Sequence, residues 1–208
     1  MFRLFIFEGI DKVGKTELIS EFAETLRSNN RNVFVLNNKK ELKYYEDFSN
    51  FHTYIKTIDN FITKTYPSLI TYFWSFLHFK NLDDNIDIII DRLHFSELAY
   101  ANFERKRELL RIFKTKSNVL SFFEDFEKSI VKIFDEIQCY CFVTDDTNTF
   151  SNDFEHPSIK QTSKNLSIVN KRYRKVFNLS KLKNKHLIEV SSENGYFNSR
   201  SKFNKLQF

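Results

Sequence analysis

Five short apolar segments are spread along the chain, and longer amphipathic or polar stretches separate them. Their length and their content of branched and aromatic side chains are typical of buried strands. The segment IDIII at 86–90 is apolar at nearly every position, which favours a strand covered on both faces. The sequence therefore predicts five strands, at residues 2–7, 32–36, 86–90, 138–143 and 186–190.

Helical periodicity occupies the intervals between the predicted strands. Within residues 16–28, apolar side chains recur at positions 18, 19, 22, 23 and 26, the spacing of one helix face. Strands that alternate with helices predict a single α/β domain, residues 1–208, in which helices cover both faces of a parallel sheet. Further helices are predicted over 68–82, 96–113, 119–134 and 167–182, a polar lid over 144–165, and only a short tail after Gly195.

Composition then narrows the class of protein. The 208 residues, 41% of them hydrophobic, suffice for one buried core. No apolar stretch approaches the roughly 20 residues of a membrane-spanning helix, and the N-terminal segment does not resemble a signal peptide. Cys139 and Cys141 make no disulfide framework; they share one strand face and are expected to be buried thiols. We therefore expect a cytoplasmic protein. Its 25 Phe and 3 Gly are typical of AT-rich genomes such as those of viruses, phages and parasites, so the cytoplasm would be the host's if the source is viral.

Positive charge is concentrated in the last quarter of the chain. The formal net charge is +5, and residues 157–208 carry twelve Lys and Arg but two acidic residues. Such a segment can contact the phosphates of a nucleic acid. A lysine-rich helix, or a basic surface near a small phosphorylated ligand, is the more ordinary explanation, so nucleic acid stays a secondary candidate partner.

The first chemically specific pattern follows the first predicted strand. Residues 9–16, GIDKVGKT, match the phosphate-binding pattern G-x-x-x-x-G-K-S/T in full, between a strand and a helix. Glycines let the backbone wrap around a phosphate, and successive N–H groups then point toward the anion. Lys15 would reach the β- and γ-phosphates of a nucleotide, and Thr16 would hold Mg²⁺. An ordinary turn would not need this Lys-Thr pair, so the segment predicts ATP and Mg²⁺ as ligands.

A second candidate pair, Asp91 and Arg92, ends the third predicted strand. A carboxylate that ends a strand beside a phosphate-binding loop can support Mg²⁺ through water. Arg92 would then face the phosphates being transferred. The alternative for Asp91 is a structural cap of the following helix, a position that Asp often takes.

Both motifs resemble those of thymidylate kinases. Residues 7–16, FEGIDKVGKT, resemble the opening of that family, and residues 91–100 match its D-R-x-x-x-S-x-x-A-Y spacing at every named position. The basic helix that carries Tyr173 and Val176 resembles the helix that follows the family's lid. The resemblance implies a P-loop NTPase three-layer sandwich, a five-stranded parallel sheet in the order 2-3-1-4-5, and a homodimer.

Functional roles follow from the resemblance, position by position. It implies that Asp11 binds the sugar 3′-hydroxyl of the acceptor and that Lys12 stabilises the transferring phosphoryl group. With Lys15, the pair Asp91 and Arg92 would complete the catalytic group, and Asp91 would join Thr16 at the metal. The residues predicted to bind ATP are Gly9, Asp11, Lys12, Val13, Gly14, Lys15 and Thr16, and those predicted to bind the acceptor are Asp11, Lys39, Phe73, Arg92, Ser96 and Tyr100.

Arginines that the family uses are missing from this chain. Residues 32–91 contain no Arg, although the family usually has one after the second strand and another near the base. Lys39 or Lys40 would replace the first of these at the acceptor phosphate, with Lys39 the residue chosen, and the resemblance places Phe73 where the base would stack. Residues 112–171 also lack Arg, which fits the branch whose catalytic cation lies in the loop, here at Lys12. Phe73 belongs to an aromatic stripe that would ordinarily be core, with Tyr72, Phe76 and Phe79.

These observations predict an ATP-dependent kinase of a deoxynucleoside monophosphate, with dTMP the acceptor that the resemblance favours. A deoxynucleoside kinase on the same scaffold is the alternative. Glu41 would then activate a sugar hydroxyl, although its polar neighbours favour a solvated loop acid. A second alternative is a kinase homologue without catalysis that binds nucleotide or nucleic acid.

Overall fold

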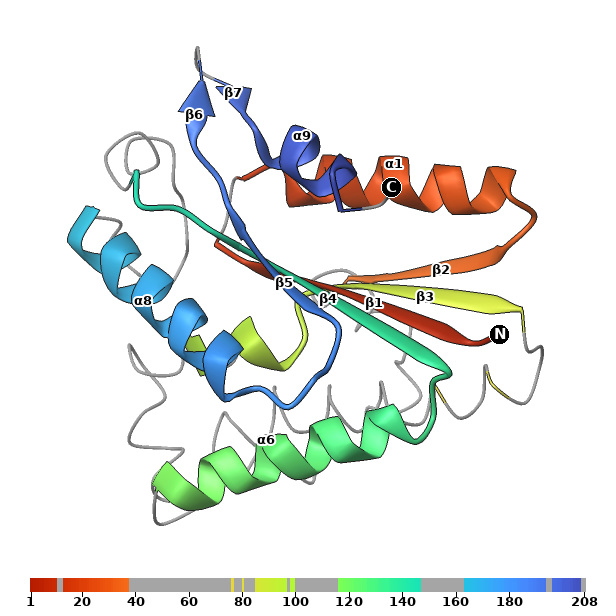
Figure 1. Cartoon of the computed structure of the whole chain (residues 1–208), viewed down its shortest axis with the longest axis horizontal. Helices are drawn as coiled ribbons and strands as arrows, with labels where there is room; N and C mark the ends of the chain where they lie inside the picture. The colour runs from red at the N-terminus through yellow and green to blue at the C-terminus, as the bar shows by residue number, and fades with distance from the viewer. Residues whose placement is uncertain are drawn as a thin grey trace, which may run out of the picture.

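The order of the strands defines the architecture (Figure 1). In the computed structural model of the chain, five parallel strands pair in the order β2-β3-β1-β4-β5, as predicted. The structure describes residues 1–10, 13–37, 76, 80, 85–96, 98–99, 116–146, 163–193 and 196–206. Every predicted strand is present within two residues of its expected ends: β1 Arg3–Gly9, β2 Asn32–Asn37, β3 Ile86–Asp91, β4 Glu136–Val143 and β5 Lys185–Glu189.

Helices cover both faces of this sheet. On one face lie α1 (Lys15–Ser28) and α9 (Ser199–Asn204), and on the other α6 (Lys116–Val131) and α8 (Ser163–Leu179) (Figure 1). Helix α8 begins inside the segment expected to be lid and ends before its predicted boundary. At that end, the Lys185 amine donates to the Phe177 and Ser180 carbonyls, each at 2.6 Å. These bonds provide donors for carbonyl groups at and just after the end of the helix. None of the described helices combines the length and apolar character needed to cross a bilayer.

The C-terminal residues are more ordered than their sequence indicates. Strands β6 (Ser192–Glu193) and β7 (Tyr196–Phe197) pair as an antiparallel hairpin, and α9 follows. Phe203 of α9 is 2% exposed, and its ring lies 5.5 Å from that of Phe22 in α1. No element is predicted here from the sequence, because one buried aromatic residue in a polar segment produces no periodicity.

Strand β1 runs through the middle of the core. Phe5 and Phe7 contact Phe22 of α1, with ring centroids 5.0 and 5.9 Å apart. Side chains alternate between the two faces of a strand, so the next residue, Glu8, points to the opposite face, away from α1. Its side chain is fully buried although it can carry a charge.

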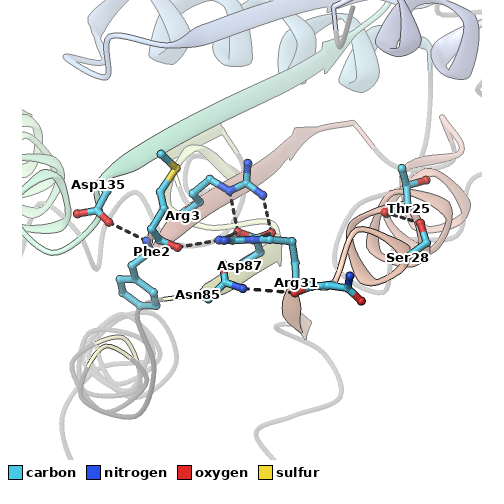
Figure 2. Close-up of polar contacts among 10 residues, drawn as sticks. Phe2, Arg3, Thr25, Ser28, Arg31, Asn85, Asp87 and Asp135 are labelled. Atoms are coloured by element: carbon cyan, nitrogen blue, oxygen red, sulfur yellow. Dashed lines mark hydrogen bonds and ion pairs between the residues drawn. The ribbon is translucent and has the colours of Figure 1, made fainter.

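A buried ionic cluster lies at the amino end of the sheet (Figure 2). Both oxygens of Asp87 accept from the guanidinium of Arg3, at 2.7 and 2.6 Å, and from that of Arg31, at 2.9 and 2.6 Å. Burial alone would raise the pKa of the Asp87 carboxyl, but the hydrogen bonds and charges of the two arginines outweigh burial and hold that pKa below its ordinary value. The cluster therefore stabilises this end of the sheet, and the predicted functional residues lie at the other end.

Candidate functional site

The glycine-containing loop connects β1 to α1 at the carboxyl end of the sheet. Gly9 has a φ of 124° and Gly14 a φ of 75°, values at which side chains are disfavoured. A Cβ on Gly9 would lie 2.1 Å from the carbonyl oxygen of Phe142 in β4. The positive φ values thus favour glycine at both positions of the predicted motif. At Gly9, the close approach of the β4 backbone also excludes a side chain.

A hydrogen bond and two buried side chains hold the described part of the loop against the core. The Ile10 amide donates to the Phe142 carbonyl at 3.1 Å, and the side chains of Ile10 and Val13 are fully buried. Apolar side chains therefore point inward. The loop can offer a phosphate its backbone N–H groups and the positive end of the α1 dipole.

Helix α1 begins with the predicted phosphate and metal ligands. Lys15 is 5% exposed, and its amine donates to the carbonyls of Gly9, at 3.4 Å, and Ile10, at closer range. The positive charge therefore lies over the loop that would bind phosphate. Thr16 follows on the first turn, and its side chain is exposed. A hydroxyl oxygen is the type of ligand that Mg²⁺ accepts.

Strand β3 brings the second motif beside this loop. Asp91 lies opposite Phe7 in the parallel pairing of β3 with β1. The Arg92 amide donates to the Phe7 carbonyl at 2.8 Å, and the φ of Arg92 is 71°. A side-chain-bearing residue in this conformation costs on the order of 1–3 kcal/mol, so surrounding contacts have to hold it.

The Glu8 carboxyl group binds backbone amides of the residues that follow Arg92. One carboxyl oxygen accepts from the amides of Leu93, at 2.8 Å, and Phe95, at 2.9 Å; the other accepts from the amide of Ser96, at 3.1 Å, and from its hydroxyl. All four hydrogen bonds are donated to the carboxyl group, an arrangement that suits its ionised form. Burial raises the pKa of Glu8 above its ordinary value, although the nearby His94 and the hydrogen bonds oppose this effect. Glu8 therefore caps the helical residues that begin at His94, the role considered for Asp91.

A second buried carboxylate reaches the same segment from α6. Nε2 of His94 lies 2.6 Å from Oε1 of Glu127, and both side chains are buried. The other oxygen of Glu127 accepts from the Lys181 amide at 2.7 Å. Burial would raise the pKa of Glu127, but its contacts with His94, Ser180 and Lys181 together outweigh burial and lower it. Glu127 thus connects the segment to α6 and to the turn after α8.

Helix α8 makes two further contacts with the residues that follow Arg92. The Tyr173 hydroxyl donates to the Ser96 hydroxyl at 3.0 Å, and Arg172 donates to the Ala99 carbonyl at 3.2 Å. Ser96, predicted to bind the acceptor, is 6% exposed and its hydroxyl lies between Glu8 and Tyr173. The neighbouring Arg174 instead pairs with Glu189, at 2.6 Å, and Asp145, at 3.1 Å, so part of the basic C-terminal charge is balanced within the chain.

The structure brings together the described members of the predicted site at one end of β1 and β3. They are Gly9, Val13, Gly14, Lys15 and Thr16 on the loop and α1, and Asp91, Arg92 and Ser96 at and after the end of β3. The remaining predicted residues lie outside the described part of the chain, namely Asp11, Lys12, Lys39, Phe73 and Tyr100, and so does Glu41.

Sequence reasoning missed two buried carboxylates at the site, Glu8 and Glu127, and also His94, the partner of Glu127. The signal for Glu8 was present, because a carboxylate at the end of an apolar strand has to find donors when it is buried. Nothing in the sequence distinguished Glu127 from the exposed acids of α6.

The aromatic stripe and the two cysteines were also considered in the sequence, and the structure buries their described members. Phe76 of the aromatic stripe is fully buried and lies 5.0 Å from the ring of Phe134, which makes it core; the other stripe members lie outside the described residues. Cys139 and Cys141 are free, buried thiols, as expected, and burial strongly raises the pKa of both. Within the described ranges, no three His, Cys, Asp or Glu side chains gather as they would around a structural metal ion.

Comparison with known proteins identifies the fold. No protein-family model and no curated protein matches the chain. A thymidylate kinase structure from Candida albicans aligns with a TM-score of 0.54 at 12% identity, over 98% of this chain and 89% of that chain. The YorR protein of Bacillus subtilis, in complex with phosphorylated GDP, aligns at 0.49 and 18% identity, over 98% and 92%. A thymidylate kinase from Ehrlichia chaffeensis aligns at 0.48 and 17%, over 93% and 90%. With its strand order, the chain has the fold of P-loop kinases, as predicted; identities this low are informative about fold alone.

Proposed function

We propose that this protein transfers the γ-phosphoryl group of ATP to a deoxynucleoside monophosphate, with dTMP converted to dTDP as the first candidate reaction. One observation carries the proposal. A glycine loop that ends in a buried Lys15 lies beside a strand end that carries Asp91 and Arg92, one of them in a strained backbone conformation. Strained residues cluster where a side chain has to be aimed at a ligand.

The proposed chemistry requires charge stabilisation more than proton transfer. An oxygen of the acceptor phosphate attacks the γ-phosphorus, the bond from that phosphorus to the β,γ-bridging oxygen breaks, and ADP leaves with the bond's electron pair. The attacking oxygen is already ionised, so no base is needed. Lys15 and Lys12 would stabilise the transferring group, and Arg92, with Lys39, would hold the acceptor phosphate. A nucleoside acceptor, in contrast, would need a base such as Glu41.

The residues present fit a magnesium–nucleotide complex. The positive φ values of Gly9 and Gly14 let the backbone of the loop turn in a way that can direct N–H groups toward a phosphate. The Thr16 hydroxyl and the Asp91 carboxylate supply hard oxygen ligands, and Mg²⁺ typically takes few protein ligands and keeps several waters. When bound, the ion would neutralise charge on the phosphates.

The test is ADP release from ATP and Mg²⁺ with a panel of acceptors: dTMP, dUMP, the other deoxynucleoside monophosphates, thymidine and deoxycytidine. We expect turnover with a monophosphate, its loss in Lys15→Ala, and its retention in the control Lys132→Ala, an exposed lysine after α6. Turnover with a nucleoside alone would replace the proposal by the deoxynucleoside kinase. Absence of turnover with every acceptor would overturn it. The homodimer implied by the resemblance is checked on the same protein by sedimentation.

A further inference from the structure

Arg92 and the residues after it need an anchor if they are to present a cation to a phosphate. The φ of 71° at Arg92 is unfavourable for an arginine in isolation. Helical residues begin two positions later, at His94, so the amides that follow Arg92 have no helical partners of their own. Some other group therefore has to bind these amides and hold the turn.

The anchor comes from the strand that also carries the phosphate-binding loop. The amides of Leu93, Phe95 and Ser96 all donate to the Glu8 carboxyl group, and the amide of Arg92 donates to the carbonyl of the preceding residue, Phe7. Two consecutive residues of β1 thus bind four of the five backbone amides from residue 92 to residue 96. A carboxylate within the chain occupies the position that an anion takes at a helix N-terminus.

We propose that Glu8 is a positioning residue that fixes Arg92, and with it the acceptor-phosphate site, relative to the ATP-binding loop. This inference rests on the proposed function. Glu8 adjoins Gly9, the first residue of the loop, so one rigid strand end sets the geometry of both the donor and the acceptor sites. Efficient transfer requires reacting groups that are held within a fraction of an ångström, which a buried strand in the middle of the sheet can provide.

Further contacts from α6 and α8 hold the segment that Glu8 binds. The hydroxyl of Ser96 donates to Glu8 and accepts from Tyr173 of α8, so the carboxyl group is also connected to the helix on that face of the sheet. The pair of His94 and Glu127 holds the same segment from α6, at 2.6 Å. The segment is therefore fixed from β1, α6 and α8, and Glu8 is the one of these contacts that adjoins the loop.

Asp87 provides a matched control for the loss of a buried carboxylate. Like Glu8, it is fully buried and accepts four hydrogen bonds on its two oxygens. It lies at the amino end of β3, the same strand whose carboxyl end carries Asp91. Asp87→Asn therefore tests whether destabilisation alone alters acceptor binding.

The decisive variant is Glu8→Gln, which keeps the length and volume of the side chain. In either orientation of the amide, its NH₂ group faces two of the four donors, and these lose their acceptor. We expect kcat/KM for the acceptor to fall between about tenfold and a hundredfold, since a displacement near 1 Å has effects of this size. The KM for ATP should stay within about twofold of wild type, because the loop is not displaced by the loss of amide partners after Arg92.

Amide hydrogen exchange gives a readout that does not depend on catalysis. In Glu8→Gln, the peptide containing residues 93–96 should exchange faster than in wild type, and the β1–β3 ladder should change less. Asp87→Asn should leave the acceptor KM unchanged, and any increase in exchange should be no larger for this peptide than for the β1–β3 ladder. Ser96→Ala removes one of the four donors, so the same peptide should exchange faster than in wild type, but by less than in Glu8→Gln. If Glu8→Gln does not fold, the exchange of Ser96→Ala is the test, because Ser96 is itself a predicted acceptor ligand and its kinetics would not isolate the role of Glu8.

Each outcome supports or contradicts the proposed role of Glu8. If wild-type protein is active and Glu8→Gln keeps its acceptor kcat/KM, or if Asp87→Asn loses as much, the role of Glu8 is wrong while the proposed function stands. Equal losses for ATP and acceptor, or a lost acceptor kcat/KM with unchanged exchange at 93–96, would also overturn it. An inactive wild type would overturn the proposed function and this role together.

Discussion

Replacement of Asp87 by Asn should destabilise the fold without removing the proposed activity. The carboxylate is fully buried and binds two guanidinium groups, Arg3 and Arg31, through two forked contacts. Asn has nearly the same shape, so no cavity forms. Its NH₂ group would face guanidinium donors, and two positive charges would lose their counter-charge.

The size of the loss follows from burial. Removal of one partner from a buried ion pair costs about 3–5 kcal/mol. The side chains of Arg3 and Arg31 are 22% and 14% exposed, so both can regain some hydration. We therefore expect the lower end, a loss of about 3 kcal/mol in the free energy of unfolding. For a chain of 208 residues, that corresponds to a fall in Tm of roughly 6–12 °C.

Urea unfolding followed by circular dichroism measures this loss directly. Asp125→Asn is a suitable control, since Asp125 forms an ion pair with Lys128 at 3.1 Å but is 68% exposed, and its midpoint should not move measurably. A loss below about 1 kcal/mol for Asp87→Asn, the range of surface pairs, would refute the assignment of this cluster as a structural element.

Two other predictions concern the loop and the effect of pH. Gly9→Ala should cost about 3 kcal/mol or more in urea unfolding, because its Cβ meets the backbone of Phe142 at 2.1 Å and its φ is 124°. Gly14→Ala should cost about 1 kcal/mol, since the nearest atom is the hydroxyl of Ser199 at 3.4 Å; equal costs would contradict this account. The folded-state pKa of Asp87 is depressed, so its stabilisation is present above the ordinary pKa of Asp and is lost as pH falls through the folded value. The difference in unfolding free energy between wild type and Asp87→Asn should therefore be constant from pH 8 to about 5 and shrink below about 4; a constant difference down to pH 2 would be inconsistent with this pKa.

Strands were predictable because each one contains a short, mostly apolar run bounded by polar residues. The run from Ile86 to Ile90, for example, can be buried only in the interior of a sheet. Helix boundaries were less predictable. The end of α8 depends on Lys185, a residue six positions beyond it, whose amine binds the last carbonyls. Such a contact exists only after β5 has joined the sheet.

The phosphate-binding loop was also predictable, since its chemistry is local. Gly9, Gly14 and Lys15 lie within seven consecutive residues, and their backbone requirements appear in the sequence as glycines in a chain that has only 3. The strained Arg92 was not predictable, because nothing in its side chain indicates a positive φ. Its conformation is held by Glu8, which lies 84 positions earlier in the sequence.

By itself, the sequence determined the strands, the parallel α/β class and the glycine loop, because apolar periodicity and glycine placement act over a few residues. Tertiary structure alone decided which carboxylates are buried and what they bind. The sequence does not indicate which donors Glu8 and Asp87 bind, and their roles depend on donors brought to them by β1, by Arg31 and by the segment after Arg92. A buried charge is stable only where such donors converge, and convergence between distant segments is a property of the folded chain.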